Sequence, residues 1–479
     1  MADSNEPIGK RLRRGRSTHA SEPSTSQPQS SIESTQNVSA NSLLYLNDKC
    51  LQEIFERLDI IDLCNMANVC KRFRPITEQV FNQRHKKFEF KGQQCKNSEF
   101  RRVLCKFGHL ITSIDASEAY FSADNEKLDA NAIPKYCTTN TLKRIILNRV
   151  TIDSGAFKPL FAHLEEIDLV RCQFTGNTKV LFNHCPNLKI FSFYADFFGP
   201  DPMDFDYRPS LRMVIQKFPK LECLGFDCNY IGFAAFLELL ALNPQVKHID
   251  ISAKSEDMFI EAIAECTKNL ESFAIHSADS LPEEQTREVF LKLSKLKKLQ
   301  KLNFEAGYEI YGQLVGPLMD AFVKEKVPIS DLDLSEFLIG PNDIKSILKL
   351  KTIKSLVLNE IVKAVNNTDL VPLAIQLPLL EHLQLNFGEK VKTPITVNGL
   401  VEMAKDGKQL EYMALVGVQN LKIDKKAFDN ILKAVQSRHN GKKLTIDIVG
   451  RSSRTTSFNV PDNVQKAASS HLKIRYSTE

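Results

Sequence analysis

Glycine, proline and an excess of charge of one sign are all scarce in this sequence. Its 479 residues include only 19 glycines and 20 prolines, which argues against low-complexity sequence outside the termini. The 63 Lys and Arg residues nearly balance the 58 Asp and Glu residues and leave a formal net charge of +5. Nucleic-acid-binding proteins usually concentrate basic residues in one region, so this balance argues against nucleic acid as a partner.

Long apolar runs and paired cysteines are also missing. The longest mostly apolar stretch, residues 230–242, is interrupted by Glu238 and is too short to cross a bilayer. The first residues are polar and charged, so no secretory signal is predicted and no membrane is expected as a partner. The 11 cysteines show no CxxC and no zinc-ligand spacing, and the nearest pair is Cys223 and Cys228. We expect free thiols, no metal, and a reducing compartment: the cytoplasm, the nucleus or both.

Motifs of catalytic sites are absent as well. The sequence has no GxxxxGK[ST] phosphate loop, no HExxH and no GxSxG elbow. Adjacent carboxylates such as Glu165 and Glu166 occupy neighbouring strand positions and point to opposite faces, so they cannot act as a pair. We therefore expect no catalytic residue, no cofactor and no enzymatic activity.

The N-terminal residues 1–41 differ from the rest of the chain. Residues 17–40 consist mainly of Ser, Thr, Gln and Pro and offer almost nothing to bury, so this segment should be disordered. It is preceded by a basic run at residues 10–16, KRLRRGR. Such a run is either a nuclear-import signal or an exposed basic stretch, and the sequence leaves both interpretations open.

Residues 42–90 have apolar residues at helical spacing. A first helix is capped by Asn47 or Asp48. A second begins at its cap Asp62, and a third has Pro75 in its first turn. Three short helices bury little surface, so this domain should gain stability by docking on a partner. The stripe of the first helix follows i, i+3, i+4, i+7 spacing: Leu51, Ile54, Phe55 and Leu58.

Residues 91–450 repeat one short apolar pattern, with apolar side chains at its first, fourth and sixth positions. Successive copies begin about 22 to 33 residues apart, which overlaps the period of leucine-rich repeats. Apolar helical stripes lie between copies, at residues 233–242, 258–264, 287–296 and 428–435. Degenerate copies stand at residues 111–116 and 444–448. The clear copies begin at Leu142, Leu164, Leu188, Leu221, Val246, Leu270, Leu299, Ile329, Ile353, Leu380 and Leu410.

This alternation predicts an α/β fold in which a strand and a helix form each repeat. Neither element can hide its apolar face alone, so neighbouring repeats must stack into a curved solenoid with a continuous core. Residues 451–479 remain open, because residues 471–476 are either a last strand that closes the solenoid or part of a loose tail.

Residues 46–73 resemble an F-box, and the remainder resembles the leucine-rich repeats that often follow one. The first half of the motif reads Leu46-Asn47, Lys49, Leu51, Ile54-Phe55 and Leu58, and the second reads Asp62-Leu63 and Val69-Cys70-Lys71-Arg72-Phe73. Three positions depart from the family pattern, because Asn47 replaces a proline, Lys49 an acidic residue and Phe73 a frequent tryptophan. The lead Cys185-Pro186-Asn187-Leu188 is also typical of such repeats.

The resemblance implies a substrate-recognition subunit of an SCF-type cullin-RING ubiquitin ligase. The F-box would dock on the Skp-type adaptor, while the repeats would hold a protein substrate. The alternative is that the apolar stripe packs only within its own helices. The residues that the motif assigns to adaptor contact are Leu46, Leu51, Ile54, Phe55, Leu58, Leu63, Val69, Cys70 and Phe73.

Side chains between the apolar repeat positions should line the concave face of the solenoid and bind the substrate. Acids outnumber bases among them, which favours a substrate with a basic segment. Alternatively, Asp between two leucines only solvates the strand. The candidates are Arg144, Ile146, Glu166, Asp168, Tyr194, Asp227, His248, Asp250, His276, Lys301, Glu305, Asp331, Asp333, His382 and Tyr412.

Three functions therefore remain open. The first is the ligase substrate receptor. The second is a ligase-independent repeat scaffold, and the third is a nucleic-acid-associated scaffold that uses the basic run. Copurification with the adaptor separates the first from the second, and deletion of residues 1–40 tests the third.

Overall fold

The computed structural model divides into two compact units, Met1–Leu51 and Gln52–Glu479, which are taken separately below. The N-terminal residues 1–42, which include the predicted tail and its basic run, lie outside the described residues. The structure describes residues 43–90, 96–118, 128–178, 181–183, 185–194, 214–227, 233–253, 256–277, 283–306, 314–335, 337–359, 361, 365–388, 394–438, 441–450 and 457–478.

The first unit ends within the first α-helix. A 3-10 turn, η1 (Leu43–Tyr45), precedes α1 (Asp48–Phe55). The side-chain oxygen of Asn47 accepts a 2.9 Å hydrogen bond from the Cys50 amide, so the predicted cap at Asn47 is confirmed. The helix stops earlier than its apolar spacing predicted. Leu58 lies in the turn that follows, where its amide bonds to the Phe55 carbonyl at 3.1 Å, and it is not part of the helical stripe.

Two further helices follow in the second unit, α2 (Ile60–Val69) and α3 (Phe73–Arg84). The predicted cap of α2 was wrong. Asp59 fills that role by accepting the Asp62 amide at 2.8 Å, which places Asp62 inside the first turn. Pro75 does lie in the first turn of α3, where its missing amide hydrogen costs nothing. Phe73, at the start of α3, packs edge to face against Phe55, with ring centroids 5.2 Å apart.

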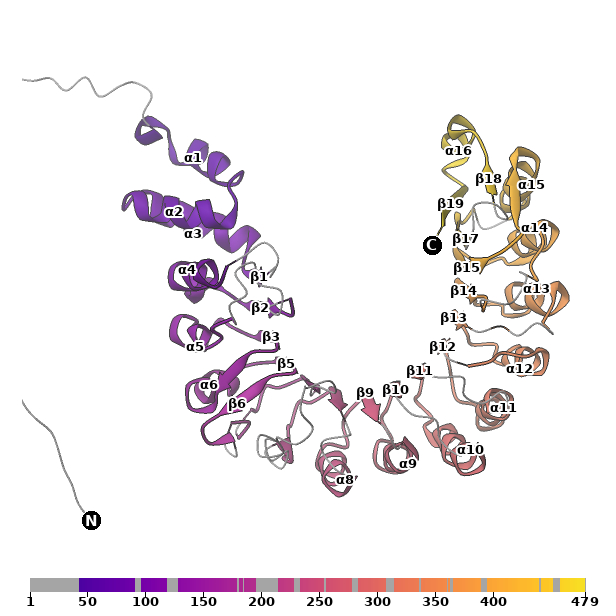
Figure 1. Cartoon of the computed structure of the whole chain (residues 1–479), viewed down its shortest axis with the longest axis horizontal. Helices are drawn as coiled ribbons and strands as arrows, with labels where there is room; N and C mark the ends of the chain where they lie inside the picture. Colours follow the sequence, from indigo (N-terminus) through magenta and orange to yellow (C-terminus); the bar gives the residue numbers. More distant parts are fainter. Residues whose placement is uncertain are drawn as a thin grey trace, which may run out of the picture. The chain divides into compact units, whose positions relative to one another are not determined.

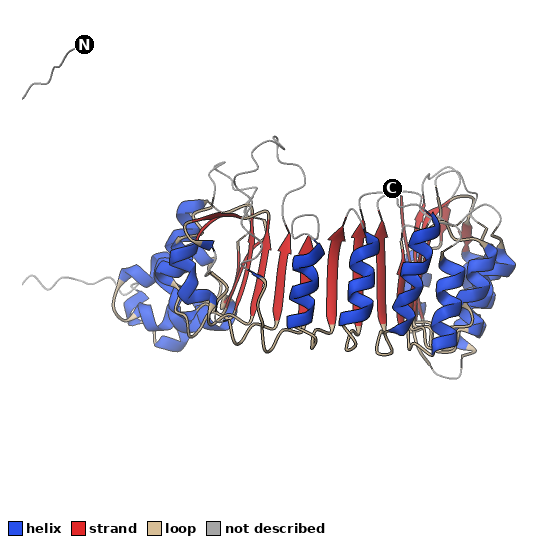
Figure 2. Ribbon diagram, turned by 90° about the horizontal axis from the view of Figure 1, so that it is seen from below, coloured by secondary structure: helices blue, strands red, loops and turns tan. Residues whose placement is uncertain are grey.

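The described strands form one long sheet in which all neighbours are parallel and follow sequence order (Figure 2). Short parallel pairs flank it at two places, β4 (Thr151–Asp153) with β6 (Gln173–Thr175) and β16 (Lys422–Asp424) with β18 (Ser457–Asn459). The 15 strands of the main sheet are β1 (Lys87–Glu89), β2 (Ser113–Ala116), β3 (Arg144–Asn148), β5 (Glu166–Val170), β7 (Ile190–Tyr194), β8 (Cys223–Asp227), β9 (His248–Ala253), β10 (Ser272–Ser277), β11 (Lys301–Ala306), β12 (Asp331–Leu334), β13 (Ser355–Leu358), β14 (His382–Asn386), β15 (Tyr412–Val418), β17 (Leu444–Gly450) and β19 (Leu472–Thr478).

Helices connect the strands and cover one face of this sheet, while the strands line the concave side of the repeat array (Figure 1). Parallel strands require such crossovers, which alternate with the strands along the chain. The 3-10 turns η2 (Gly108–Leu110) and η7 (Lys292–Lys295) extend two of them. The helices are α4 (Asn97–Phe107), α5 (Ala132–Tyr136), α6 (Ser154–Phe161), α8 (Phe233–Leu242), α9 (Glu256–Cys266), α10 (Glu283–Leu291), α11 (Val315–Glu325), α12 (Pro341–Ile347), α13 (Asn367–Gln376), α14 (Val397–Asp406), α15 (Lys425–Gln436) and α16 (Asp462–Ala468).

The predicted repeat positions form the core. In every clear copy, all three apolar side chains are buried, at no more than 4% exposure. Strand pairing brings equivalent positions side by side: Ile145 pairs with Ile167, and Ile167 pairs with Phe191. The repeats therefore stack as predicted, and each apolar ladder continues from one repeat to the next.

The sheet extends past both ends of the predicted repeat region. Strand β1 lies within residues 42–90 and pairs with β2, so the sheet begins inside the segment that was predicted to be helical. At the other end, β19 pairs with β17 from Leu444–Leu472 to Gly450–Thr478. Of the two alternatives for residues 471–476, the last strand is the one that the structure has.

The nine cysteines within the described ranges are free thiols, and Cys228 lies outside those ranges. Burial raises the pKa of the Cys137 and Cys185 thiols to about 12, so they behave as small apolar side chains. None of the helices that the structure describes has the length and apolarity needed to cross a membrane.

Candidate functional site

The residues predicted to contact an adaptor divide into three groups by exposure. Leu51, Phe55, Leu63 and Phe73 are buried at 0 to 1% exposure and serve as core. Leu46, Leu58 and Cys70 are half-buried. Two side chains remain open to solvent: Ile54 at 36% and Val69 at 60%. The predicted stripe therefore serves mainly as internal packing. Leu51 and Phe55 are buried, whereas Ile54 is exposed to solvent.

Sequence reasoning missed three exposed apolar residues of the first unit. Leu43, Leu44 and Tyr45 are 41%, 55% and 63% exposed. The available signal was their position, since they form the only apolar triplet between the polar tail and α1. Among the described residues, nine large apolar side chains are exposed, and five of these fall within residues 43–81. Exposed apolar side chains gathered in a short segment indicate a protein-binding surface.

The concave face presents polar side chains in rows, because strand pairing aligns equivalent positions of successive repeats. The first row opens the strands, and the predicted residues within it contact one another. Arg144 Nε lies 2.8 Å from Glu166 Oε2, and Lys301 Nζ lies 3.9 Å from Asp331 Oδ1. The first row is Ser113, Arg144, Glu166, Ile190, Cys223, His248, Ser272, Lys301, Asp331, Ser355, His382 and Tyr412.

The middle row carries the acidic side chains. Asp168, Asp250 and Asp333 stand in it at intervals of three strands, separated by small or neutral residues. Three strands span about 14 Å at the usual interstrand spacing. The middle row is Asp115, Ile146, Asp168, Ser192, Gly225, Asp250, Ala274, Asn303, Asp333, Val357, Gln384, Ala414 and Asp447.

The Asp168 carboxyl group of this row has a raised pKa. Burial raises its pKa from 3.8 to about 6, Arg144 acts to lower it, and Asp115 and Asp250 raise it further. Its Oδ1 atom has no hydrogen-bond partner among the described residues. Asp250 Oδ1 likewise makes no hydrogen bond among the described residues, but it lies 2.9 Å from Nε2 of His276, so two predicted substrate residues contact each other there.

This pKa predicts the pH dependence of stability. The folded state holds the Asp168 proton more tightly than the unfolded chain, so its stabilising contribution is present below about pH 3.8 and is lost as the pH rises through about 6. Asp168→Asn should therefore raise the urea midpoint relative to wild type at pH 7 and have no such advantage at pH 3.5. Urea unfolding of both proteins across this pH range measures the effect. If the difference between their midpoints is the same at every pH, the assignment is wrong.

Other concave candidates need correction. Asp227 is only 4% exposed, so its carboxylate is not available to a substrate. Tyr412 donates its hydroxyl hydrogen to Asp447 Oδ2 at 2.9 Å, and Arg475 donates two 2.6 Å hydrogen bonds to the same carboxylate. Of the other candidates, Ile146, Tyr194 and His248 are half-buried and His382 is exposed, whereas the side chain of Glu305 lies outside the described part.

Sequence reasoning also missed Asp115, Asp447 and Arg475 as concave residues. The first two stand in the degenerate repeat copies, between Ile114 and Ala116 and between Ile446 and Ile448. Reading those copies in the same register as the clear ones would have found both. Arg475 required the last strand to be recognised.

Across the described ranges, no three His, Cys, Asp or Glu residues are grouped so that they could hold a metal ion. The adjacent acids Glu165 and Glu166 bind different cations, since Lys189 Nζ lies 2.7 Å from Glu165 and Arg144 binds Glu166.

Comparison with known proteins gives one family match. The family model for the F-box domain matches residues 43–81. No curated protein matches the chain in sequence. Among solved structures, the chain is similar to one in the crystal structure of the Rad7 and Elc1 complex in yeast, with 12% identity, a TM-score of 0.43, and coverage of 89% of this chain and 92% of that chain.

These findings define the class of protein. The chain has an F-box domain followed by strand–helix repeats that build a long parallel sheet, as leucine-rich repeats do. The predicted resemblance to F-box proteins with C-terminal leucine-rich repeats is confirmed, and so is the predicted fold class.

Proposed function

We propose that this protein is the substrate-recognition subunit of an SCF-type ubiquitin ligase. The observation that carries the proposal is the F-box match at residues 43–81, a segment that also holds most of the exposed large apolar side chains described in the structure. Such a subunit needs no active site, because it raises the effective concentration of a substrate lysine beside the ubiquitin-carrying enzyme. Free thiols fit a reducing compartment, so we place its action in the cytoplasm or the nucleus.

Adaptor docking would use the exposed side chains rather than the buried ones. In the first unit these are Leu43, Leu44 and Tyr45, and in the second they are Ile54 and Val69. A standard interface buries roughly 800 Å² on each partner, with a few central anchors supplying most of the energy. Size-exclusion chromatography of the full chain with a purified Skp-type adaptor tests the proposal. Co-elution at one-to-one stoichiometry supports it, and separate elution at micromolar concentration counts against it.

The concave face would hold the substrate. Asp168, Asp250 and Asp333 of the middle row stand about 14 Å apart, which an extended peptide spans in about four residues. We infer that the preferred substrate segment crosses the strands and carries a basic residue at about every fourth position. The carboxylates would supply steering and complementarity.

Neutralising the middle row tests this inference. Asp168→Asn, Asp250→Asn and Asp333→Asn together should weaken binding of a fluorescein-labelled octalysine peptide about tenfold in low salt, since each exposed pair is worth up to about 1 kcal/mol. The matched control replaces three aspartates on the helices, Asp320, Asp406 and Asp462, with Asn. If anisotropy titrations show equal losses in the two variants, or an affinity that salt does not change, the aspartates only solvate the strands.

A ligase-independent repeat scaffold is the second candidate. It is favoured by the departures from the F-box pattern at Asn47 and Lys49. Failure of the adaptor to bind, with retained binding of the lysine peptide, would identify this function instead.

A further inference from the structure

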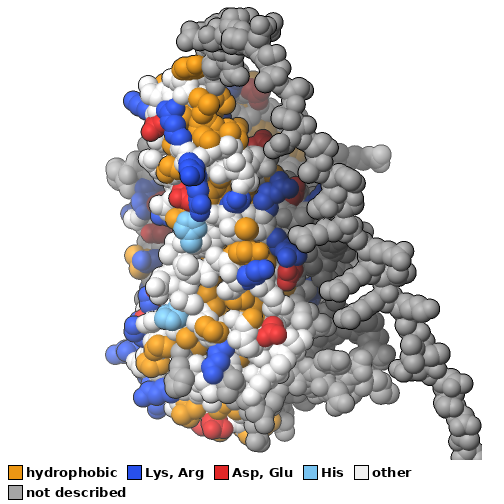
Figure 3. Space-filling view, turned by 90° about the vertical axis from the view of Figure 1, so that its left-hand side faces the viewer, with side chains coloured by type: hydrophobic (Ala, Val, Ile, Leu, Met, Phe, Trp, Pro, Cys, Tyr) orange, Lys and Arg blue, Asp and Glu red, His pale blue; other side chains and the backbone are white. Residues whose placement is uncertain are grey.

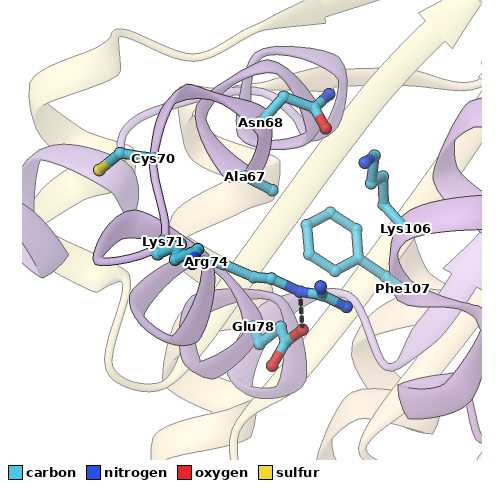
Figure 4. A pocket seen from close by; sticks show the side chains of 8 residues that line it. All are labelled: Ala67, Asn68, Cys70, Lys71, Arg74, Glu78, Lys106 and Phe107. Carbon is cyan, nitrogen blue, oxygen red and sulfur yellow. Dashed lines mark hydrogen bonds and ion pairs between the residues drawn. The ribbon is translucent and has the colours of Figure 1, made fainter.

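A groove lies beside the F-box helices and is separate from the concave face. It is a depression of about 360 Å³ between the last turn of α2, the first two turns of α3 and the end of α4 (Figure 4). Phe107 forms an apolar floor, and Asn68, Lys71, Arg74, Glu78 and Lys106 supply polar groups. Its volume falls within the range of specific ligand pockets. We call these lining residues the α2–α4 groove.

Positive charge dominates the α2–α4 groove. Lys71 and Arg74 are exposed, and Lys106 is half-buried. Glu78 is the single acidic residue in the lining, and Arg74 Nε already binds its Oε1 at 3.0 Å. His109 Nε2 lies 3.8 Å from the same oxygen. Three cations against one neutralised carboxylate leave an excess of two positive charges when His109 is neutral.

The cations continue beyond the depression along α4. Arg102 stands one turn before Lys106, about 6 Å along the helix axis. Its Nη1 lies 3.5 Å from Oδ1 of Asn65, which is one turn before Asn68 on α2. Asn65 and Asn68 thus border one side of the groove, and Arg102 and Lys106 border the other. The cations of the groove and of α4 therefore form an extended row. Figure 3 shows Lys and Arg side chains spread over the face that it displays.

The helix dipoles of α2 and α3 do not change the sign of the net charge of the α2–α4 groove. The carbonyl end of α2 contributes about half a negative charge, and the amino end of α3 about half a positive charge. Arg72 occupies the N-cap of α3 without a side-chain capping bond, and the Phe73 amide bonds to the Cys70 carbonyl at 3.2 Å. The formal charges of Lys71, Arg74 and Lys106 therefore decide the ligand.

We propose that the α2–α4 groove binds an acidic segment of a protein partner, rich in Asp and Glu. An extended line of cations with amide hydrogen-bonding groups opposite matches successive carboxylates along a peptide. The aliphatic stems of the lysines would cover the apolar part of the peptide, whereas Phe107 is 1% exposed and belongs to the floor of the groove. Cys70, which the F-box motif assigns to adaptor contact, also lines the groove, but the three cations are not among the apolar residues proposed for the adaptor dock.

Charge reversal tests the proposal on the full-length chain. The probe is a fluorescein-labelled octaglutamate peptide, and fluorescence anisotropy in low salt measures its affinity. Lys71→Glu with Lys106→Glu should weaken binding about tenfold or more, and a glutamine peptide should bind neither protein. The control is Lys405→Glu with Lys433→Glu, which makes the same change in net charge at exposed lysines of α14 and α15 and should stay within about twofold of wild type.

Three results would overturn the assignment. Equal losses in the two double variants would show that only net charge matters. An unchanged affinity in Lys71→Glu with Lys106→Glu would show that the peptide binds elsewhere. A phosphoserine peptide that binds about tenfold tighter than octaglutamate would replace carboxylate with phosphate as the ligand. Lys71→Gln with Lys106→Gln repeats the test without charge reversal if the first variant unfolds.

Discussion

Replacing Ile54 and Val69 with aspartate should weaken binding of the Skp-type adaptor by at least about 100-fold, since anchor positions of an interface cost about 2 kcal/mol or more each when removed. Both side chains are exposed in the isolated chain, at 36% and 60%, so the free protein should keep its fold. In the complex, each carboxylate would be buried without a partner, which adds a desolvation penalty. Biolayer interferometry with purified adaptor measures the change in dissociation constant.

The choice of positions matters for this experiment. Phe55 belongs to the same predicted stripe, but it is fully buried against Phe73, so Phe55→Ala would destabilise the helices and lose binding for an indirect reason. The matched control is Val323→Asp with Ile375→Asp, two exposed apolar side chains on α11 and α13. Adaptor affinity should be unchanged in this control. If both double variants bind like wild type, the adaptor does not use the exposed apolar side chains.

Phe191→Ala should lower the free energy of unfolding by about 3 to 5 kcal/mol, the usual cost of truncating a buried phenylalanine. Phe191 is fully buried on β7. Its ring lies 5.1 Å from that of Phe182 and 5.9 Å from that of Phe218, so it joins side chains of successive repeats. Each repeat is stabilised mainly by its neighbours, and the loss should therefore spread along the array.

Urea unfolding followed by circular dichroism measures the total loss, and hydrogen exchange of β5, β7 and β8 measures where it occurs. Phe191→Leu is the control, because a more similar volume should cost less than about half as much. A loss below about 1 kcal/mol for Phe191→Ala would contradict the continuous core, as would faster exchange that is confined to β7.

The repeat architecture could be predicted because burial acts on every copy alike. A residue such as Leu332 must be apolar to pack between its neighbours Leu302 and Leu356, and the same demand recurs through the sheet. The predicted strands and helices therefore match the structure even where the copies differ in length. Repetition averages out the ambiguity that a single short apolar run would leave.

Where the structure departs from the sequence-based predictions, the cause is backbone geometry or tertiary packing that the sequence pattern does not report. Asp59 and Asp62 are both good helix caps, and the choice between them depends on backbone geometry that spacing does not report. The burial of Asp227 depends on side chains from other repeats, which one strand pattern cannot reveal. The α2–α4 groove combines Lys71 and Arg74 with Lys106 from a helix that lies more than 30 residues later. Such sites arise from tertiary packing and have no contiguous motif.

The central claim is that this chain is the adaptor-bound receptor of a cullin-RING ligase. The most direct test is to express the tagged full-length chain in cells and to probe what copurifies for Skp-type adaptor and for cullin. We predict that wild type brings down both and that Ile54→Asp with Val69→Asp brings down neither. If wild type retains neither protein under conditions in which an established F-box protein retains both, the claim is wrong and the chain is a repeat scaffold outside the ubiquitin system.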